Sequence, residues 1–319
     1  MSRFEVTALG EAMLRLSVPP GERLETMTRL DVHLGGAELN VCAALASLGR
    51  RCAWLSRLPE GPLGRFVLRA ARAAGVATPG VSLAAGARLG AYYVEFAAPP
   101  RATEVIYDRA GSAFTGLSAA LVDWEPLLDT RALHLTGITL ALGEGPFSAA
   151  REAARRAKAQ GVLVSLDLNY RRKLWSPQEA ARRLADVLPF VDLLVCARAD
   201  ARTVFGLGDA PETVLGALHD LCPAENIVLT CAQDGAVARL AGELVHAPAS
   251  AAAVLDRIGA GDAFSAGLLD GWLDGDLRAG LARGAALSAL ALAQRGDLLV
   301  TSREEMNAVV ERSPSTVNR

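Results

Sequence analysis

The sequence contains few residues of the kinds that form disulfides or hold metals. It has 5 cysteines and 4 histidines in 319 residues. No cysteine belongs to a Cys-x-x-Cys pair, and neither residue type recurs at the spacing of a metal site. We therefore expect buried, reduced thiols and no zinc site. The formal charge of -2 provides no general attraction to nucleic acid, so small molecules are the expected partners.

Long apolar runs are also missing. No run approaches the roughly 20 residues that a membrane-spanning helix needs, and the alanine-rich stretch near Leu290 is interrupted by Gln294 and Arg295. Residues 1–10 alternate in polarity, which predicts a first strand and not a secretion signal. With 51% hydrophobic and 21% charged residues, the chain can bury a large core. We expect a cytoplasmic globular enzyme with no membrane partner.

Residues 130–300 alternate short apolar runs with segments of helix length. This rhythm is typical of βαβ units and predicts a mostly parallel sheet flanked by helices. One helix start is clear at Ser176, because an N-cap hydroxyl is followed by a first-turn proline and by Glu179. Strands are predicted at 133–135, 162–168, 191–196, 227–230 and 236–240. Helices are predicted at 38–48, 148–160, 262–273, 278–293 and 303–310.

Two segments nearer the N-terminus have a different sequence pattern. Residues 11–35 and 86–109 contain short β-type stretches without helices, such as Ala91–Phe96. We interpret them as a small sheet that covers a site. The predicted organisation is a single domain over residues 1–319, with a β lid formed by roughly 11–35 and 86–115.

The most informative motif is Asp-Arg-Ile-Gly-Ala-Gly-Asp-Ala-Phe at residues 256–264. Glycines let the backbone approach a ligand closely, and the unpaired N–H groups at a helix N-terminus stabilise an anion such as phosphate. Asp262 would stand beside these groups, where a carboxylate can accept the proton of an attacking hydroxyl. The alternative is a glycine-rich turn capped by an aspartate, and spacing alone leaves both interpretations open.

A second motif upstream, Gly-Gly-Ala-Glu-Leu-Asn-Val-Cys-Ala at residues 35–43, favours the first interpretation. Together the two motifs resemble the signatures of the ribokinase-like (PfkB) carbohydrate kinases. The resemblance extends along most of the chain and implies a Rossmann-like α/β body with a β-sheet lid. It implies that Asp262 is the catalytic base, and that the turn before it is an anion hole that also contacts the nucleotide, formed by Gly259, Ala260 and Gly261. Sugar contacts are implied for Gly35, Gly36 and Asn40.

Within the family, the chain is most similar to the 2-keto-3-deoxygluconate kinases. The similarity lies in Tyr92, 107–109, 167–171, 174–177 and 295–297. A sugar acid carries a carboxylate, which the guanidinium groups of Arg109 and Arg171 could bind through paired hydrogen bonds. The other substrate contacts expected are Tyr92, Tyr107, Asn169 and Asp297. Outside the motif, each of these residues would be an ordinary strand aromatic, surface arginine or turn former.

The sequence departs from the family pattern where ATP and magnesium are expected. The usual Asn-x-x-Glu segment is Ala197-Arg198-Ala199-Asp200, so any metal role of Asp200 is indirect. The nucleotide-binding turn is residues 230–235, in which Thr230 and Gly235 match the pattern but Ala232 disfavours a positive φ angle. Arg257 takes a position commonly held by a small residue or proline. It could crowd the turn or add positive charge beside the phosphates.

We therefore expect ATP-dependent phosphorylation, with Mg²⁺, of a sugar acid hydroxyl, most specifically of 2-keto-3-deoxygluconate to its 6-phosphate. Two rival functions remain. One is a kinase of the same family acting on a neutral sugar, as fructokinases and ribokinases do. The other is a catalytically weak sugar- or nucleotide-binding protein. An exposed lid edge also predicts a homo-oligomer, with a dimer as the working hypothesis.

Overall fold

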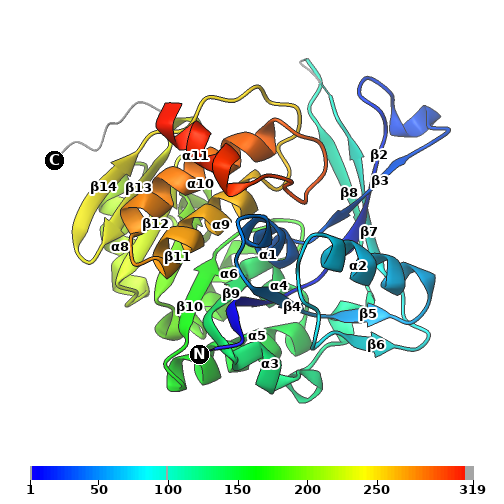
Figure 1. Cartoon of the computed structure of the whole chain (residues 1–319), viewed down its shortest axis with the longest axis horizontal. Coiled ribbons are helices and arrows are strands. Elements are labelled where there is room, and N and C mark those ends of the chain that lie inside the picture. The colour runs from blue at the N-terminus through cyan, green and yellow to red at the C-terminus, as the bar shows by residue number, and fades with distance from the viewer. Residues whose placement is uncertain (1, 98–99, 313–319) are drawn as a thin grey trace.

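The centre of the molecule is an eight-stranded sheet in the order β14-β13-β12-β11-β10-β9-β1-β4 (Figure 1). The strands from β4 to β12 in this order are parallel, and β13 and β14 extend the sheet antiparallel at one edge. The computed structural model describes residues 2–97 and 100–312. The strand bounds are β1 Phe4–Leu9, β4 Cys52–Leu55, β9 Thr130–Thr136, β10 Leu163–Asp167, β11 Leu193–Ala197, β12 Asn226–Thr230, β13 Ala236–Leu240 and β14 Glu243–Ala247.

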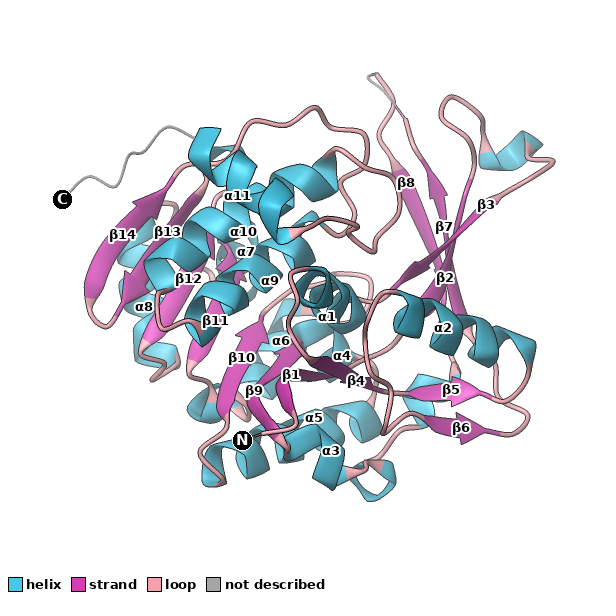
Figure 2. Cartoon of the chain, viewed as in Figure 1, coloured by secondary structure: helices cyan, strands magenta, loops and turns pink. Residues whose placement is uncertain are grey.

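Helices cover both faces of this sheet because its strands are apolar on both sides (Figure 2). In β11, Leu194 packs in the cluster under one layer and Val195 in the cluster under the other. One layer contains α1 Ala37–Ser47, α2 Pro62–Ala73, α9 Ala260–Leu273, α10 Leu277–Leu292 and α11 Arg303–Arg312. The other contains α3 Trp124–Leu128, α4 Gly137–Ala141, α5 Glu144–Ala159, α6 Pro177–Ala185, α7 Arg198–Phe205 and α8 Pro211–Leu221.

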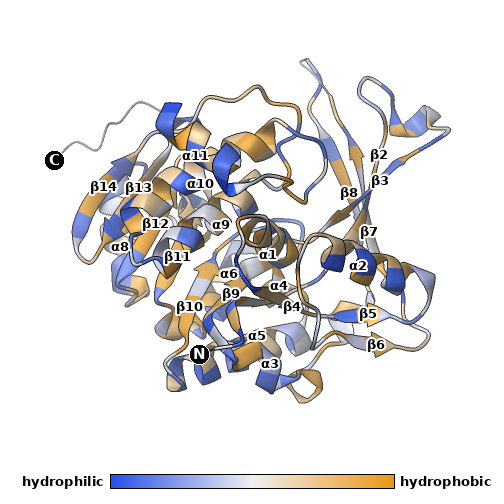
Figure 3. Cartoon of the chain, in the orientation of Figure 1, coloured by the Kyte–Doolittle hydropathy of each residue, from blue (hydrophilic) through white to orange (hydrophobic). Residues whose placement is uncertain are grey.

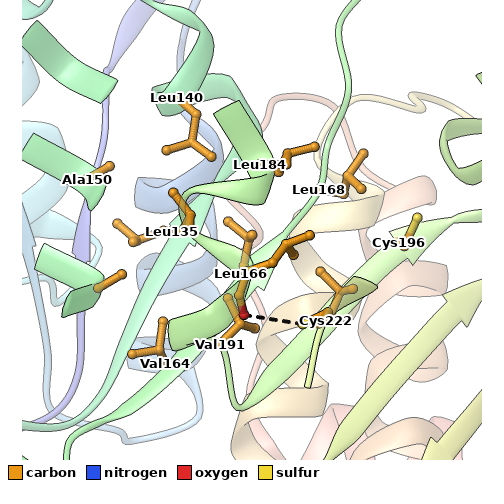
Figure 4. Packing of buried hydrophobic residues seen from close by; sticks show 14 of the residues in the cluster. Leu135, Leu140, Ala150, Val164, Leu166, Leu168, Leu184, Val191, Cys196 and Cys222 are labelled. Atoms are coloured by element: carbon orange, nitrogen blue, oxygen red, sulfur yellow. Dashed lines mark hydrogen bonds between the residues drawn. The ribbon is translucent and has the colours of Figure 1, made fainter. Parts of the chain in front are cut away.

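The core under the second layer is continuous from the sheet to the helices. Figure 4 shows Val164 and Leu166 of β10 packed near Leu184 of α6 and Ala150 of α5. Figure 3 shows hydrophobic residues gathered on the strands and hydrophilic residues on the outer helix surfaces. Among the described residues, no helix is both long and apolar enough to cross a membrane.

Small residues bring α9 and α10 into close contact. A Cβ atom on Gly267 would lie 2.4 Å from the backbone nitrogen of Gly284, and one on Gly271 would lie 2.3 Å from the Cα atom of Gly280. Neither position can accept a side chain without moving the neighbouring helix. The glycines thus fix α9, whose N-terminal turn carries Asp262.

A separate four-stranded sheet stands beside the main body in the order β3-β2-β7-β8, at the right in Figure 1. Its strands are β2 Met13–Ser17, β3 Asp31–Gly35, β7 Gly90–Glu95 and β8 Glu104–Asp108, and we call it the small sheet. These strands fall within the two segments predicted as a lid. The second predicted segment includes Phe114, which packs in the main core. A two-stranded sheet, β5 Arg57–Pro59 and β6 Ser82–Ala84, completes the fold.

Helix starts with a local signal agree best with the sequence. The Ser176 hydroxyl accepts a hydrogen bond from the Glu179 N–H at the start of α6, as predicted. In contrast, α5 begins at Glu144, before the predicted Ser148. Pro146 lies in the first turn of α5, where its missing N–H has no helical partner to lose.

Candidate active site

Two adjoining cavities open at the carboxyl ends of the parallel strands. Asp167, Ala197 and Thr230 end β10, β11 and β12, and all three line the first cavity. This edge is where ligands bind in open α/β sheets. The first cavity, of about 670 Å³, is partly walled by the small sheet, and we call it the small-sheet cavity. The second, of about 990 Å³, reaches α10, and we call it the α10 cavity. They share the lining residues Ala197, Thr230, Ala232, Arg257 and Gly261.

The small-sheet cavity gathers every residue that the sequence predicted to contact a sugar. Strands β3, β7 and β8 of the small sheet, helices α1 and α9, and loops contribute them, although they are widely separated in the chain. Its lining includes Gly35, Gly36, Asn40, Tyr92, Tyr107, Arg109, Asn169, Arg171, Asp262 and Asp297. Its volume falls in the range of small-molecule sites.

Asp262 lies in the first turn of α9 and in the wall of this cavity. Its side chain is largely enclosed, with the residue 9% exposed. Asn40 Nδ2 donates a 2.7 Å hydrogen bond to Asp262 Oδ2. Burial raises the pKa of Asp262 to about 8, while the Asn40 bond lowers it and the nearby Asp167 raises it further. The carboxyl group can therefore exchange a proton near neutral pH.

The turn before Asp262 presents free backbone donors. Within residues 2–97 and 100–312, nothing accepts a hydrogen bond from the N–H of Gly259, Ala260 or Gly261. Gly259 has a φ angle of +88°, and a Cβ atom there would lie 2.8 Å from the Asp297 carbonyl oxygen. The turn thus requires glycine at this position. Its amides, at a helix N-terminus, can stabilise an anion.

Two further carboxylates, Asp167 and Asp200, line the same cavity as Asp262, and Asp167 has no role predicted from the sequence. Burial, followed by the charge of Asp200, raises the pKa of Asp167 to about 7. Asp200 itself accepts a 3.0 Å hydrogen bond from the Tyr170 N–H, and burial raises its pKa. Asp167 ends β10, which is the sequence signal that could have identified it. Both carboxylates line the small-sheet cavity.

Arg109 and Arg171 both line the cavity, but their surroundings differ. Arg109 is buried, and its Nε donates a 2.9 Å hydrogen bond to Glu11 Oε2, so its charge is already paired. Arg171 is exposed and forms no ion pair with any described residue. Of the two guanidinium groups predicted to bind a substrate carboxylate, Arg109 is already paired with Glu11, and Arg171 is unpaired among the described residues.

Asp297 was predicted to accept hydrogen bonds from sugar hydroxyls, yet it already has internal partners. Arg15 Nη1 donates a 2.7 Å hydrogen bond to Asp297 Oδ1, and the Tyr92 hydroxyl donates to Asp297 Oδ2. Tyr92 packs against Tyr107 with ring centroids 5.7 Å apart. A carboxylate has further lone pairs, so Asp297 can still accept a hydrogen bond from a ligand while Arg15 and Tyr92 fix its orientation.

The α10 cavity has the features of a nucleotide site. Its walls include the apolar Phe264 and Leu292, together with the predicted Thr230, Gly235, Ala260 and Gly261. Three arginines also line it. Arg198 pairs with Asp234 at 2.9 Å and Arg202 with Asp209 at 3.2 Å, whereas Arg257 has no ion pair among the described residues. An unpaired cation at the wall common to both cavities suits phosphate groups.

Ala232 departs from its prediction. The sequence suggested that alanine disfavours a positive φ angle in this turn, but Ala232 has a φ of +53°. The turn therefore keeps its left-handed geometry at a cost of roughly 1–2 kcal/mol. The hydrogen bond from the Cys231 N–H to the Gly235 carbonyl oxygen, 2.7 Å long, holds it closed.

Glu38 is another residue of the small-sheet cavity with no role predicted from the sequence. It is buried, and its Oε1 accepts 2.7 Å hydrogen bonds from the hydroxyls of Thr136 and Thr139. Burial raises its pKa. Its position in the 35–43 motif, close to Asn40, was the available signal.

The chain is similar to known proteins over most of its length. A family model described as pfkB family carbohydrate kinase matches residues 3–302. A 2-dehydro-3-deoxygalactonokinase of Haloferax volcanii is 40% identical over 99% of both chains. The crystal structure of 2-dehydro-3-deoxygluconokinase from Thermotoga maritima superposes with a TM-score of 0.90, at 33% identity, over 97% of this chain and 98% of that one. A crystal structure of an E. coli protein in complex with ATP and Mg²⁺ shares the fold, with a TM-score of 0.88 at 21% identity over 97% of this chain and 100% of that one.

Proposed function

This chain belongs to the pfkB family of carbohydrate kinases, and we propose that it transfers the γ-phosphoryl group of ATP to a hydroxyl of a keto-deoxy sugar acid. The substrate is 2-keto-3-deoxygluconate, converted to its 6-phosphate, or the galactonate epimer that one relative's name carries. One observation carries the proposal. Asp262 stands beside the free amides of Gly259–Gly261, and Gly261 lies in the wall shared by the two cavities.

The proposed reaction is a direct in-line transfer. The deprotonated Asp262 takes the proton of the sugar hydroxyl, whose oxygen forms a bond to the γ-phosphorus as the bond to the ADP oxygen breaks. The N–H groups of Gly259, Ala260 and Gly261 donate hydrogen bonds to the phosphoryl oxygens as their charge develops. Asn40 orients the carboxylate through its 2.7 Å hydrogen bond.

Mg²⁺ would neutralise phosphate charge when bound with ATP. Among the described residues, no three His, Cys, Asp or Glu side chains are grouped to hold a metal. Mg²⁺ usually needs only one or two protein carboxylates in addition to substrate phosphates and water. Asp200 and Asp167, both facing the small-sheet cavity, provide such carboxylates, so the residues fit the ion.

Recognition of the acid is assigned to Arg171. Its guanidinium group is free of ion pairs among the described residues, and a planar guanidinium matches a carboxylate through two parallel hydrogen bonds. Tyr92 and Tyr107 offer apolar ring surface to the carbon chain of the sugar.

A panel of sugars tests the proposal, with ADP release as the readout. Arg171→Ala is expected to raise the KM for 2-keto-3-deoxygluconate by about tenfold or more, because a charge-assisted pair is lost. The KM for any neutral sugar that is accepted should change much less. Arg172→Ala is the matched control, because this neighbouring exposed arginine lines neither cavity. Equal losses for acid and neutral sugar in Arg171→Ala would contradict the assignment.

A neutral-sugar kinase is the second candidate. The Glu11–Arg109 pair favours it, because this pair takes one of the two predicted guanidinium groups out of use. The same panel separates the candidates: a kcat/KM for fructose or ribose above that for every acid would select the neutral sugar.

We also propose that the protein self-associates through the small sheet. Val32 of β3 and Ile106 of β8 are 52% and 45% exposed on its two outer strands. Exposed edges of this kind favour pairing with another sheet. Sedimentation over a range of protein concentrations measures the association.

A further inference from the structure

Arg15 is a buried arginine that connects the small sheet to the main body. It lies in the middle of β2 and is 1% exposed. Its Nη1 donates to Asp297 Oδ1 at 2.7 Å, and its Nη2 donates to Asp256 Oδ2. Its guanidinium carbon lies 4.9 Å from the ring centroid of Phe96. One forked side chain thus contacts two carboxylates that are 41 residues apart in the chain, as their numbers, 256 and 297, indicate.

The two carboxylates hold the catalytic turn from both sides. Asp256 accepts a 3.0 Å hydrogen bond from the Ile258 N–H and a 3.3 Å hydrogen bond from the Gly296 N–H. It therefore ties the start of the turn to the loop that carries Asp297. The carbonyl oxygen of Asp297 lies against Gly259, where a Cβ atom would be only 2.8 Å away. A shift of either carboxylate would displace the turn.

A second strand of the small sheet, β7, also contacts Asp297. Tyr92 of β7 is the register partner of Arg15 in β2, and its hydroxyl donates to Asp297 Oδ2. Tyr92 and Asp297 both line the small-sheet cavity, but neither Arg15 nor Asp256 is among the described residues that line either cavity. Arg15 can therefore act on a ligand only through the groups that it holds.

The positive charge of Arg15 compensates the two buried carboxylates that it contacts. Burial raises the pKa of Asp297, and the adjacent Arg15 guanidinium lowers it. Without Arg15, Asp256 and Asp297 would be two buried carboxylates with no cation between them, an arrangement that proteins avoid. Lysine is a poor substitute, because a single ammonium group cannot reproduce the planar fork.

We propose that Arg15 is a positioning residue that couples the placement of the small sheet to the geometry of the Gly259–Gly261 turn, through Asp256 and Asp297. This inference rests on the proposed kinase reaction. Sugar binding against Tyr92 and the arrangement of the phosphate-binding amides would then depend on one another. A sugar that holds the small sheet in place would thereby stabilise the turn that performs the transfer.

The test compares the whole chain with its Arg15→Lys and Asp256→Asn variants. ADP release gives kcat and both KM values with the best sugar from the panel. Hydrogen–deuterium exchange follows the Ile258 amide of the turn and the Gly296 amide, which both donate to Asp256, without any ligand. We expect Arg15→Lys to lower kcat at least tenfold, to raise the sugar KM severalfold, to leave the ATP KM within about twofold, and to speed exchange in the turn. Asp256→Asn should give the same pattern, and it carries the test if Arg15→Lys does not fold.

Arg50→Lys is the matched control. Arg50 is also held by carboxylates, with Nε 2.7 Å from Asp270 Oδ1, and it lines neither cavity. It should lower the melting temperature with kcat, both KM values and turn exchange unchanged. Folded Arg15→Lys with wild-type kinetics and exchange would overturn the inference, as would an equal loss in Arg50→Lys. A wild type that phosphorylates only a neutral sugar would refute the acid proposal alone, because the exchange comparison needs no substrate.

Discussion

At the scale of single residues, the protonation of Asp262 is the property on which the proposed reaction depends. Burial, more than any neighbouring charge, raises its pKa to about 8, and Asp167 adds to this effect. A general base works best when its pKa lies near the working pH, since it must be ionised and still hold a proton strongly. The environment of Asp262 meets this requirement without a histidine.

This environment predicts the pH dependence of the reaction. Only deprotonated Asp262 accepts the hydroxyl proton, so kcat/KM should rise with pH and level off above about 8. Asp167→Asn removes a charge that raises the pKa of Asp262, so the rising limb should move to lower pH. Rates measured between about pH 6 and pH 10 test this. A limb that stays in place, or moves to higher pH, would exclude the coupling between the two carboxyl groups.

The residues that line the small-sheet cavity could be predicted from the sequence where a motif contains them, whereas contacts between distant segments could not. Asp262, Gly259 and Asn40 were predicted because each belongs to a short motif. The pairing of Arg109 with Glu11 was missed, because these residues are separated by 98 positions and no local pattern links them. Ala232 shows a different limit: the intrinsic preference of alanine disfavours a positive φ angle, yet Ala232 adopts one in a turn closed by the Cys231–Gly235 hydrogen bond.

At the scale of elements, the start of α9 is the critical feature. Gly259 combines a φ of +88° with a neighbouring carbonyl oxygen that leaves no room for a side chain, whereas a Cβ atom on Gly261 would meet nothing within 4 Å. Gly259 and Gly261 flank Ala260, yet only at position 259 does the backbone conformation require a glycine.

Alanine substitutions separate these two positions. Gly259→Ala should lower the free energy of unfolding by about 1–3 kcal/mol, through left-handed strain and the contact with Asp297. Gly261→Ala should leave it unchanged or raise it by up to about 1 kcal/mol, because alanine favours a helix. Chemical denaturation measures both values. Equal destabilisation by the two substitutions would show that the turn does not have the backbone geometry described.

Elements were predictable to the extent that their signals are local. The cap at Ser176 and the alternating apolar runs of β12 and β13 depend on neighbouring residues, and the predicted bounds are close to those observed. In α5, the first turn is stabilised by Phe147, which is buried against the main core. That contact is tertiary, so the sequence alone placed the start of the helix four residues late, at 148 in place of 144.

At the scale of the whole molecule, one ion-pair network joins separate helices behind the site. Asp270 of α9 is fully buried and forms ion pairs with three arginines. Arg50 follows α1, Arg283 belongs to α10 and Arg303 begins α11. Burial raises the pKa of Asp270, but the bonds from Arg303 and Arg50 outweigh this effect and hold it below its usual value. The network stabilises the layer that carries Asp262.

Asp270→Asn tests that role. We expect it to lower the free energy of unfolding at pH 7 by about 2–3 kcal/mol, because a partly exposed network loses its central charge. A carboxyl group whose pKa is lower in the folded protein stabilises the fold at pH values above its pKa in the unfolded chain. This stabilisation is lost as the pH falls through its pKa in the folded protein. The difference from wild type should therefore shrink below about pH 4, while kcat at pH 7 stays within about twofold. Constant destabilisation down to pH 2 would contradict this electrostatic account.

The central claim of the proposal is that Asp262 accepts the proton of the sugar hydroxyl during phosphoryl transfer. The two cavities and the free amides form one reaction centre only if this is so. The most direct measurement is the turnover and sugar affinity of Asp262→Asn, with Asp274→Asn at the other end of α9 as the control. We predict a fall in kcat of about 10²–10⁴-fold, with the Kd for the sugar from calorimetry within about threefold of wild type. Turnover by Asp262→Asn equal to that of the wild type and the control would contradict the account.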